Sequence, residues 1–234
     1  MVCIVTGAGR GIGRAIALRV ARLGYSVVCA ARSVGEIERV AEEIRREGGR
    51  AEAIPADLAD PDAIAALFAE TERRLGHPDV LVNNAGVGAF GEVVDFPAAD
   101  LDRLYNVNLR GTFLCCQQAM RRMVPRGSGY IVNISSVVGF RGYPNQSGYS
   151  ATKHAVMGLT KALAAEAQPH GVRVSAVLPG GVDTEMVRSA RPDLDPEELL
   201  APEDVAGAVA YLLSLSERAA VDEIYIRRRN SKAF

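Results

Sequence analysis

The sequence is short of lysine, has no tryptophan and has no long apolar segment. Lys153, Lys161 and Lys232 are the only lysines among 27 basic residues. No apolar run approaches the roughly 20 residues that a membrane-spanning helix needs. The formal net charge of −1 shows no excess of positive charge of the kind that attracts nucleic acid. We therefore expect neither a membrane nor a nucleic-acid partner.

Cysteine is also scarce and is not arranged for metal binding. Three of the four cysteines lie in runs that read as buried, so we expect small core hydrophobes. They are Cys3, Cys29, Cys115 and Cys116. The three histidines have no metal-ligand neighbours, so we expect no metal site. The N-terminus enters an apolar run at once and leaves no room for a signal peptide, so we expect a cytoplasmic protein.

What the chain does have is a regular alternation of short β-branched runs and longer amphipathic segments. The expected strands are 2–5, 25–31, 51–55, 79–83, 130–135 and 173–179, with a further edge strand at 222–226. The expected helices are 11–23, 33–47, 61–75, 99–124, 148–168 and 202–215. This order predicts an α/β fold of the Rossmann type, a doubly wound parallel sheet of about seven strands with helices on both faces. We expect one domain, 1–234, with a substrate-side loop at about 180–200.

A glycine-rich turn, TGAGRGIG at 6–13, directly follows the first expected strand and opens a helix. Gly7 permits a tight turn, Gly11 lets the backbone approach a pyrophosphate, and Gly13 allows close packing of helix and strand. A purely structural turn is the alternative. The strand–turn–helix context favours nucleotide binding.

The end of the second strand indicates which dinucleotide. NAD enzymes place an acid there for the ribose 2′-hydroxyl, whereas this chain has Ala31 followed by Arg32. Arg10, inside the glycine turn, could reach the same phosphate as Arg32. A solvated Arg32 is the alternative, but the pattern favours NADP(H). Asp57 follows the third strand, where it could meet the adenine amino group or cap the next helix.

With these features the sequence resembles the short-chain dehydrogenase/reductase family, in its single-domain, NADP-preferring branch. The matching motifs keep the family's order and spacing over essentially residues 1 to 215. They are TGAGRGIG (6–13), NNAG (83–86), NVN (106–108), the serine pair of NISS (135–136), YSATK (149–153) and PGGVDT (179–184).

The resemblance implies a catalytic set. Tyr149 and Lys153 are four residues apart and share one helix face. The resemblance makes Tyr149 the general acid/base and Lys153 its partner, which also anchors the nicotinamide ribose. The ammonium and an oxidised nicotinamide would lower the tyrosine pKa. Family spacing selects Ser136 over Ser135 to hold the substrate carbonyl oxygen. Asn108 corresponds to an asparagine of a proton relay, with a buried packing amide as the alternative.

The same resemblance implies a cofactor site that runs along the ends of the strands. We expect Asn84, with Asn83, to be more structural than catalytic, and expect Val182 and Thr184 near the nicotinamide carboxamide. The residues expected to contact the cofactor are Gly7, Arg10, Gly11, Ile12, Gly13, Arg32, Asp57, Leu58, Asn84, Ala85, Gly86, Tyr149, Lys153, Pro179, Gly180, Val182 and Thr184.

The C-terminus departs from the family pattern. The strand-like run survives, but the glycine pair that follows it in many members is replaced within AVDEIYIRRRNSKAF. The tail is similar to that of hydroxy-acid and carbonyl reductases. We expect the three arginines at 227–229 to form a solvated tail, with pairing to a partner subunit as the alternative. We expect the substrate pocket to be bounded by Phe90, Phe140, Tyr143 and 185–200.

The predicted function is that of an oxidoreductase, which moves a hydride between NADP(H) and a carbonyl or secondary alcohol. The expected substrates are of the 3-oxoacyl, 3-hydroxy-acid or small-ketone type. One alternative is a non-catalytic NADP(H)-sensing or scaffold protein on the same fold, which we expect to have a damaged tyrosine–lysine–serine set. Another is a nucleoside-cofactor methyltransferase, which would not need YxxxK. The resemblance implies a homo-oligomer, a dimer or tetramer, formed through the helices at 99–124 and 148–168.

Overall fold

The computed structural model describes residues 1–190 and 194–231 and contains one seven-stranded sheet. The strands are all parallel, in the order β3-β2-β1-β4-β5-β6-β7. They are β1 (Val2–Thr6), β2 (Ser26–Ala31), β3 (Ala51–Pro55), β4 (Val80–Asn83), β5 (Gly129–Ile134), β6 (Val172–Pro179) and β7 (Glu223–Ile226). The chain winds outward from β1 to β3 and then from β4 to β7. The order therefore reverses between β1 and β4, where such folds bind ligands.

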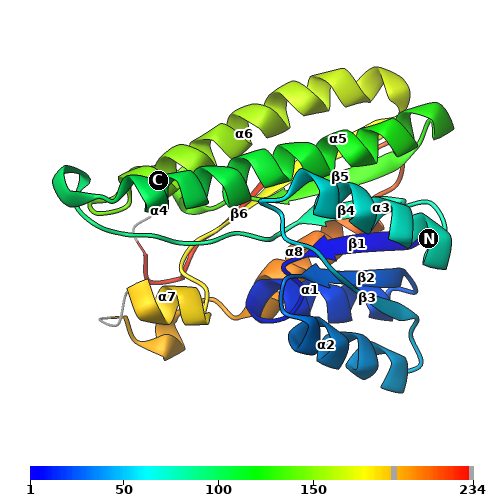
Figure 1. Cartoon of the computed structure of the whole chain (residues 1–234), viewed down its shortest axis with the longest axis horizontal. Coiled ribbons are helices and arrows are strands. Elements are labelled where there is room, and N and C mark those ends of the chain that lie inside the picture. The colour runs from blue at the N-terminus through cyan, green and yellow to red at the C-terminus, as the bar shows by residue number, and fades with distance from the viewer. Residues whose placement is uncertain (191–193, 232–234) are drawn as a thin grey trace.

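Helices cover both faces of the sheet, as the sequence predicts (Figure 1). One layer is formed by α1 (Gly11–Arg22), α2 (Val34–Arg46) and α8 (Pro202–Ser214). The opposite layer is formed by α3 (Pro61–Leu75), α5 (Thr112–Met123) and α6 (Ser147–Ala167). The doubly wound fold and the position of every expected strand are confirmed.

Two segments differ from the sequence prediction. The expected helix at 99–124 is interrupted, because a π-helical segment (Tyr105–Gly111) joins α4 (Ala98–Leu104) to α5. The expected loop at 180–200 contains α7 (Glu185–Ala190) and a short 3₁₀ turn (Pro196–Glu198), while 191–193 lie outside the described residues. Its two ends are bonded together, since Leu200 N–H donates to the Gly181 carbonyl at 3.0 Å.

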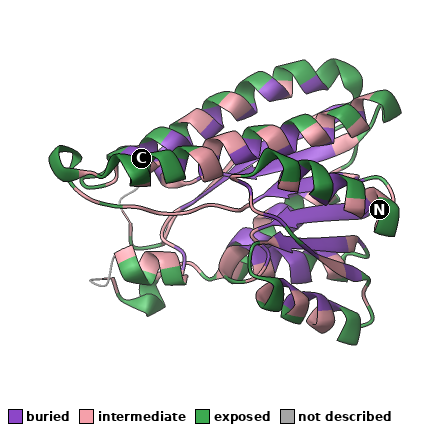
Figure 2. Cartoon of the chain, viewed as in Figure 1, coloured by how far each residue is buried: buried purple, intermediate pink, exposed green. Residues whose placement is uncertain are grey.

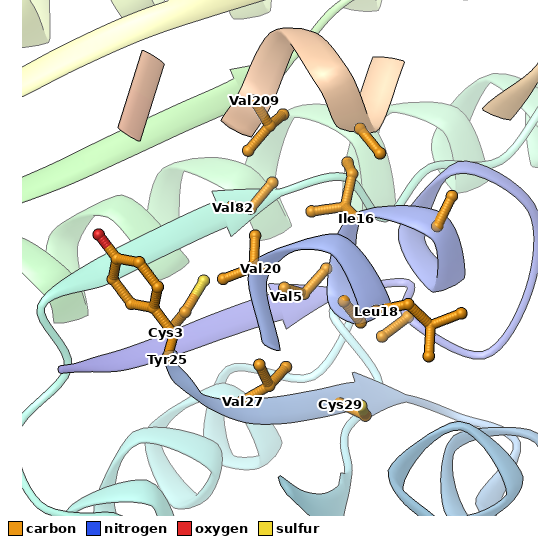
Figure 3. Close-up of a cluster of buried hydrophobic side chains, with 14 of the residues drawn as sticks. Cys3, Val5, Ile16, Leu18, Val20, Tyr25, Val27, Cys29, Val82 and Val209 are labelled. Carbon is orange, nitrogen blue, oxygen red and sulfur yellow. The ribbon is translucent and has the colours of Figure 1, made fainter. Parts of the chain in front are cut away.

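The core consists of two apolar layers, one on each side of the sheet. Successive residues of β1 point to opposite faces, so Cys3 and Val5 pack under α1, whereas Ile4 belongs to the other layer. Figure 3 shows the first of these layers, and Figure 2 shows that the central strands of the sheet are buried. This continuous burial explains the apolar runs without alternation in the sequence.

All four cysteines are buried in these layers and none forms a disulfide, whereas the sequence predicted burial for three of them. Burial raises the pKa of each thiol well above its usual range, so the thiols stay protonated. Within the described part of the chain, no group of three or more histidine, cysteine or acidic side chains is placed to hold a metal ion. None of the helices of residues 1–190 and 194–231 is long and apolar enough to cross a membrane.

Candidate active site

A cleft of about 1550 Å³ opens at the carboxyl ends of the strands. Its walls come from the segments that follow β1, β2, β3, β4, β5 and β6, so residues far apart in sequence meet along one edge of the sheet. Every residue predicted to contact the cofactor lines this cleft, together with Ser136. Of the predicted site residues, only Asn108 does not line it.

The glycine turn after β1 leaves room for a ligand's phosphates. Gly7 and Gly11 have φ values of +66° and +52°, a conformation that favours glycine. A Cβ on Gly13 would lie 2.1 Å from the Gly7 carbonyl oxygen, so only glycine lets α1 start this close to β1. Exposed backbone N–H groups at the start of a helix suit a pyrophosphate. The residues present thus fit a dinucleotide cofactor.

Asn84 holds the glycine turn against the sheet. Its amide Nδ2 donates to the carbonyls of Thr6 at 3.0 Å and Gly7 at 3.3 Å. The Thr6 hydroxyl in turn accepts from the backbone N–H groups of Asn84 and Ala85, both at 3.1 Å. The neighbouring Asn83 is buried and donates to Asn133 Oδ1 at 2.9 Å. Both asparagines thus have the structural contacts that the sequence predicts.

The end of the cleft beside β2 is lined by Ala31 and Arg32, with no carboxylate at either position. Arg10, predicted to reach the same phosphate, forms an ion pair with Glu185 of α7. Asp57 does not cap α3, because Asp60 does so by accepting from Asp62 N–H at 2.9 Å. Asp57 instead accepts from Ala59 N–H at 3.0 Å, inside its own turn.

Two residues at this end were missed by sequence reasoning. Ser33 and Glu36 line the cleft, and the Glu36 side chain lies against Gly9 of the glycine turn. Glu36 is in the first turn of α2, where an acidic residue is common because of the helix dipole. Nothing in the sequence therefore distinguishes it from an ordinary helix residue.

Ser136 and Tyr149 are brought together at the centre of the cleft. Ser136 follows β5, and its Oγ donates to the Pro179 carbonyl at 3.4 Å. Burial raises the pKa of Tyr149 to about 12, and a hydrogen bond with the Ser136 side chain acts in the opposite direction. The neighbouring Ser135 is buried and donates to the Lys153 carbonyl at 3.1 Å, which gives it a structural contact.

Lys153 is one turn further along α6 and is buried beside the tyrosine. Its Nζ lies 5.8 Å from the centroid of the Tyr149 ring and donates to the Ile134 carbonyl at 2.9 Å. Burial alone lowers the pKa of Lys153 to about 8. The sequence predicted a tyrosine pKa below its usual range, whereas burial raises it here. The hydrogen bond with Ser136 opposes this rise, and a positive charge brought in with a ligand would lower the Tyr149 pKa further.

Replacement of Lys153 by methionine is expected to stabilise the protein at neutral pH while removing its activity. The folded-state pKa of Lys153 is about 8, below the ordinary 10.5. Below pH 8 the buried side chain is charged, so the whole free-energy penalty for burying that charge lowers the stability of the fold. The penalty fades as the pH rises from about 8 to 10.5. We expect Lys153→Met to raise the free energy of unfolding by on the order of 2–3 kcal/mol at neutral pH.

Urea unfolding of both proteins across this pH range checks the expectation. Other titrating groups are common to both proteins and cancel in the difference. A stability difference that does not shrink as the pH rises would mean that Lys153 is not held in a site that disfavours its charge.

Asn108 lies at the π-helical segment, behind the cleft wall. Its Oδ1 accepts from Val87 N–H at 2.8 Å, and its Nδ2 donates to the Val87 carbonyl at 3.0 Å and to Thr152 Oγ1 at 3.3 Å. The side chain thus braces the segment after β4 against α6. Its relay role stays a prediction. The π-helix itself had no sequence signal, although such bulges are frequent at functional sites.

Aromatic side chains stand over the reactive end of the cleft. The Phe90 and Tyr149 rings meet edge to face at 5.6 Å between centroids. Tyr143 also lines the cleft, as predicted, but Phe140 does not, because it is 58% exposed and meets Tyr225 at 6.5 Å. Phe140 follows β5 by several residues, and sequence spacing alone could not tell which way its ring turns.

The C-terminal segment also contributes to the cleft, against the expectation of a solvated tail. Arg227 and Arg228 are half-buried and line it, whereas Arg229 is exposed. The expectation fails because β7 pairs with β6, with Ile226 opposite Pro179. That pairing brings the residues after β7 to the same edge of the sheet as the other site residues.

Comparisons with known proteins agree with this geometry. The family model described as short chain dehydrogenase matches residues 1–195. A 3beta-hydroxysteroid dehydrogenase of Mediterraneibacter gnavus is 41% identical over 194 residues, 82% of this chain and 70% of that protein. A 3-oxoacyl-(acyl-carrier-protein) reductase FabG of Staphylococcus aureus is 41% identical over 221 residues, 90% of this chain and 89% of that protein.

Solved structures are similar to this chain over nearly its whole length. An alcohol dehydrogenase of the archaeon Thermococcus sibiricus, complexed with 5-hydroxy-NADP, has a TM-score of 0.92 and 31% identity, covering 100% of this chain and 98% of that one. Actinorhodin polyketide ketoreductase with NADPH has a TM-score of 0.91 and 33% identity, covering 97% and 95%. The similarity thus extends from the glycine turn to the C-terminal strand.

Proposed function

This chain belongs to the short-chain dehydrogenase family and is an oxidoreductase, and we propose that it interconverts a carbonyl and a secondary alcohol with NADP(H). The observation that carries the proposal is the meeting of Ser136, Tyr149 and Lys153 in the cleft that the glycine turn opens. The intact set argues against a non-catalytic sensing protein. Membership of the short-chain dehydrogenase family excludes the alternative of a methyltransferase.

Ser136, Tyr149 and Lys153 have different roles at the carbonyl oxygen of the substrate. A bound nicotinamide cofactor would supply the hydride that reduces the carbonyl carbon and, in the reverse direction, would accept it. In reduction, Ser136 donates a hydrogen bond to the substrate oxygen and Tyr149 gives that oxygen its phenolic proton, while the electron pair of the C=O π bond moves onto the oxygen. Tyr149 is left as the phenolate, which the nearby Lys153 ammonium stabilises. In oxidation the proton returns to Tyr149.

The protonation of the site favours proton donation. Burial raises the pKa of Tyr149 to about 12, so at neutral pH it holds the proton that reduction requires. Use as a base requires a lower tyrosine pKa, for which a bound oxidised nicotinamide supplies the additional positive charge. Asn108 would relay protons toward Lys153 from behind the cleft, as the family resemblance implies.

NADP(H) is preferred to NAD(H) in this proposal because no acid stands at the end of β2. Ala31 brings no carboxylate, and Arg32 lines the same end of the cleft. Arginine suits a phosphate through its fixed pair of donors. Two similar structures hold 5-hydroxy-NADP and NADPH. Arg10 would join the phosphate only by leaving its ion pair with Glu185.

A carboxylate introduced at position 31 is expected to reverse the cofactor preference. We expect the wild-type protein to bind NADPH at least ~10-fold more tightly than NADH, since charge-assisted hydrogen bonds contribute about 1.5–3 kcal/mol. Ala31→Asp repels the 2′-phosphate and offers an acceptor to the ribose hydroxyl, so it should weaken NADPH and strengthen NADH. Fluorescence titration of each protein with both cofactors measures the change.

Ala31→Asn is the control, because it adds the same volume without charge. It should change the NADPH/NADH ratio much less than the aspartate. A wild-type protein that binds NADH as tightly as NADPH would contradict the argument from Ala31 and Arg32.

For the substrate, we propose the 3-oxoacyl, 3-hydroxy-acid or small-ketone type. One relative is named for a 3-oxoacyl-(acyl-carrier-protein) and another for a 3beta-hydroxysteroid, so the names give an oxo group in one case and a hydroxyl group in the other. Spectrophotometric NADPH consumption across a panel of these ketones tests the class. Failure of every ketone in the presence of bound NADPH would contradict it.

We further propose a homo-oligomer that works in the cytoplasm. Leu101, Tyr105 and Phe113 are about half exposed along the α4–α5 helical segment, where a partner subunit would cover them. Four unpaired, buried cysteines suit a reducing compartment.

A further inference from the structure

The two arginines that follow β7 are placed in the cleft by the sheet itself. Gly180 N–H donates to the Ile226 carbonyl at 2.7 Å, which continues the β6–β7 pairing past Pro179. A Cβ on Gly180 would lie 3.5 Å from the Arg227 Cα and 3.6 Å from the Arg228 backbone nitrogen. The backbone of the arginine pair therefore runs directly beside the segment after β6, which carries the predicted nicotinamide contacts.

Arg227 fixes the shape of this segment. Its guanidinium NH1 donates to the carbonyls of Arg228 at 3.1 Å, Arg229 at 3.2 Å and Ser231 at 2.7 Å. One side chain thus ties down three backbone carbonyls of the tail. The consequence is a rigid turn, on which Arg228 has a defined place.

The Arg228 side chain extends along Gly181. A Cβ on Gly181 would lie 3.6 Å from the arginine Cδ and 3.8 Å from its Nε. Glycine at position 181 therefore provides the space in which this side chain lies. Within the described residues the guanidinium has no hydrogen-bond or ion-pair partner, although it is half-buried and lines the cleft.

Two acids that line the cleft after β6 are already paired with other arginines, and Glu198, which meets the tail, accepts from Asn230 Nδ2 at 3.3 Å. Asp183 forms a two-pronged pair with Arg188, at 2.6 and 2.7 Å, and Glu185 pairs with Arg10. The acids of 194–231 do not line the cleft. Arg228 is thus a half-buried cation that forms no ion pair with any of the described residues.

Its distance from the reacting centre suits a substrate group. Ser136 follows β5 and bonds the Pro179 carbonyl at the end of β6, and Arg228 follows β7. Two strand spacings amount to about 10 Å, part of which an arginine side chain can span. A substrate held at its oxygen by Ser136 and Tyr149 would thus present atoms beyond its carbonyl carbon to Arg228.

We propose that Arg228 binds an anionic group, a carboxylate or a phosphate, on the substrate and so selects acidic ketones and alcohols. The proposal rests on the proposed function, because it names a recognition residue for the same reaction. Arginine meets carboxylate and phosphate with the same pair of parallel hydrogen bonds. Arg228 is a binding residue and takes no part in the proton transfer.

The experiment compares charged and uncharged ketones on wild-type protein, Arg228→Met and Arg229→Met. The carboxylate arm uses 3-oxo acids of increasing chain length against their methyl esters. The phosphate arm uses dihydroxyacetone phosphate against dihydroxyacetone. Methionine keeps much of the arginine's apolar stem, and the exposed Arg229 is the matched control. Steady-state kinetics are measured with saturating NADPH, and NADPH affinity is measured separately by fluorescence.

We expect Arg228→Met to lower kcat/KM by ~10- to 100-fold for the anionic member of one pair, mainly through KM. The uncharged member of that pair and the NADPH affinity should hardly change, and Arg229→Met should behave as wild type. If kcat/KM falls for the 3-oxo acids, the recognised group is a carboxylate. If it falls for dihydroxyacetone phosphate, the group is a phosphate.

Three results would overturn the proposal. Equal losses on charged and uncharged ketones would show that Arg228 only supports the fold of the tail. A weakened affinity for NADPH would assign it to the cofactor. A wild-type enzyme that reduces the uncharged ketones as well as the anionic ones would show that no anion is recognised, while leaving the proposed function intact. The proposed function itself would fail separately, if no ketone were reduced at all.

Discussion

Tyr149→Phe is expected to lower turnover by about two to four orders of magnitude while NADPH still binds. The substitution removes one oxygen atom, the one that carries the proton to the substrate, and leaves the ring against Phe90 in place. General acid catalysis by a positioned side chain contributes about 10²–10⁴-fold, so kcat should fall by that factor. NADPH affinity should change little, because the glycine turn and Lys153 are untouched. Single-turnover kinetics and fluorescence titration separate the two effects.

Tyr143→Phe is the matched control, since it removes a hydroxyl from another tyrosine of the same cleft. Tyr143 is 42% exposed, and no hydrogen bond ties its hydroxyl to Ser136. We expect near wild-type turnover. If Tyr149→Phe kept more than about a tenth of the wild-type rate, another group would have to supply the proton.

Gly13→Ala is expected to remove cofactor binding and to destabilise the fold. The added Cβ would lie 2.1 Å from the Gly7 carbonyl oxygen and 2.5 Å from Asn84 Nδ2. Neither is the end of a flexible side chain that could swing away, because the Asn84 amide is itself bonded to Thr6 and Gly7. Helix α1 must therefore shift from β1, which costs about 1–3 kcal/mol or more. The shift also moves the N–H groups that would meet the pyrophosphate, so NADPH affinity should fall more than ~10-fold.

Gly207→Ala makes the same chemical change where there is space. Gly207 lies inside α8, and a Cβ there would meet no atom within 4 Å. Alanine is favoured over glycine in a helix by about 0.5–1 kcal/mol, so this variant should be slightly more stable and bind NADPH normally. Thermal unfolding and NADPH titration of both variants check the pair. A Gly13→Ala protein as stable and as tight-binding as Gly207→Ala would refute the close packing of the turn.

Most of the fold could be predicted because its elements follow local rules. Runs such as Val2–Thr6 are buried on both faces and so read as almost wholly apolar strands. The π-helical segment at Tyr105–Gly111 could not be predicted from local rules, and it makes contacts with distant parts of the chain. Asn108 turns inward to bond Val87 and Thr152, and a Cβ on Gly111 would lie 2.7 Å from the Leu58 carbonyl. Neither contact leaves a periodic trace in the sequence.

The site residues that lie in sequence motifs could be predicted. The site residues that are distant in sequence and meet only because their strands pair in the sheet could not. Tyr149 and Lys153 share one helix face, so their proximity follows from spacing. Glu36 and Arg228 reach the cleft from segments whose residues look like ordinary surface charges. The high pKa of Tyr149 likewise depends on burial, which spacing does not reveal. Such properties arise from packing across strands.

The most direct test of the account is to follow the transferred hydrogen. NADPH carrying deuterium at the transferable position of nicotinamide C4 is incubated with the protein and a ketone that it reduces, and the alcohol is analysed by mass spectrometry. We predict one deuterium on the carbinol carbon of the product, one NADP⁺ formed per alcohol, and a rate of product formation about 10²–10⁴-fold lower with Tyr149→Phe. Alcohol formed without deuterium at that carbon, or NADPH bound and never oxidised by any ketone, would contradict it.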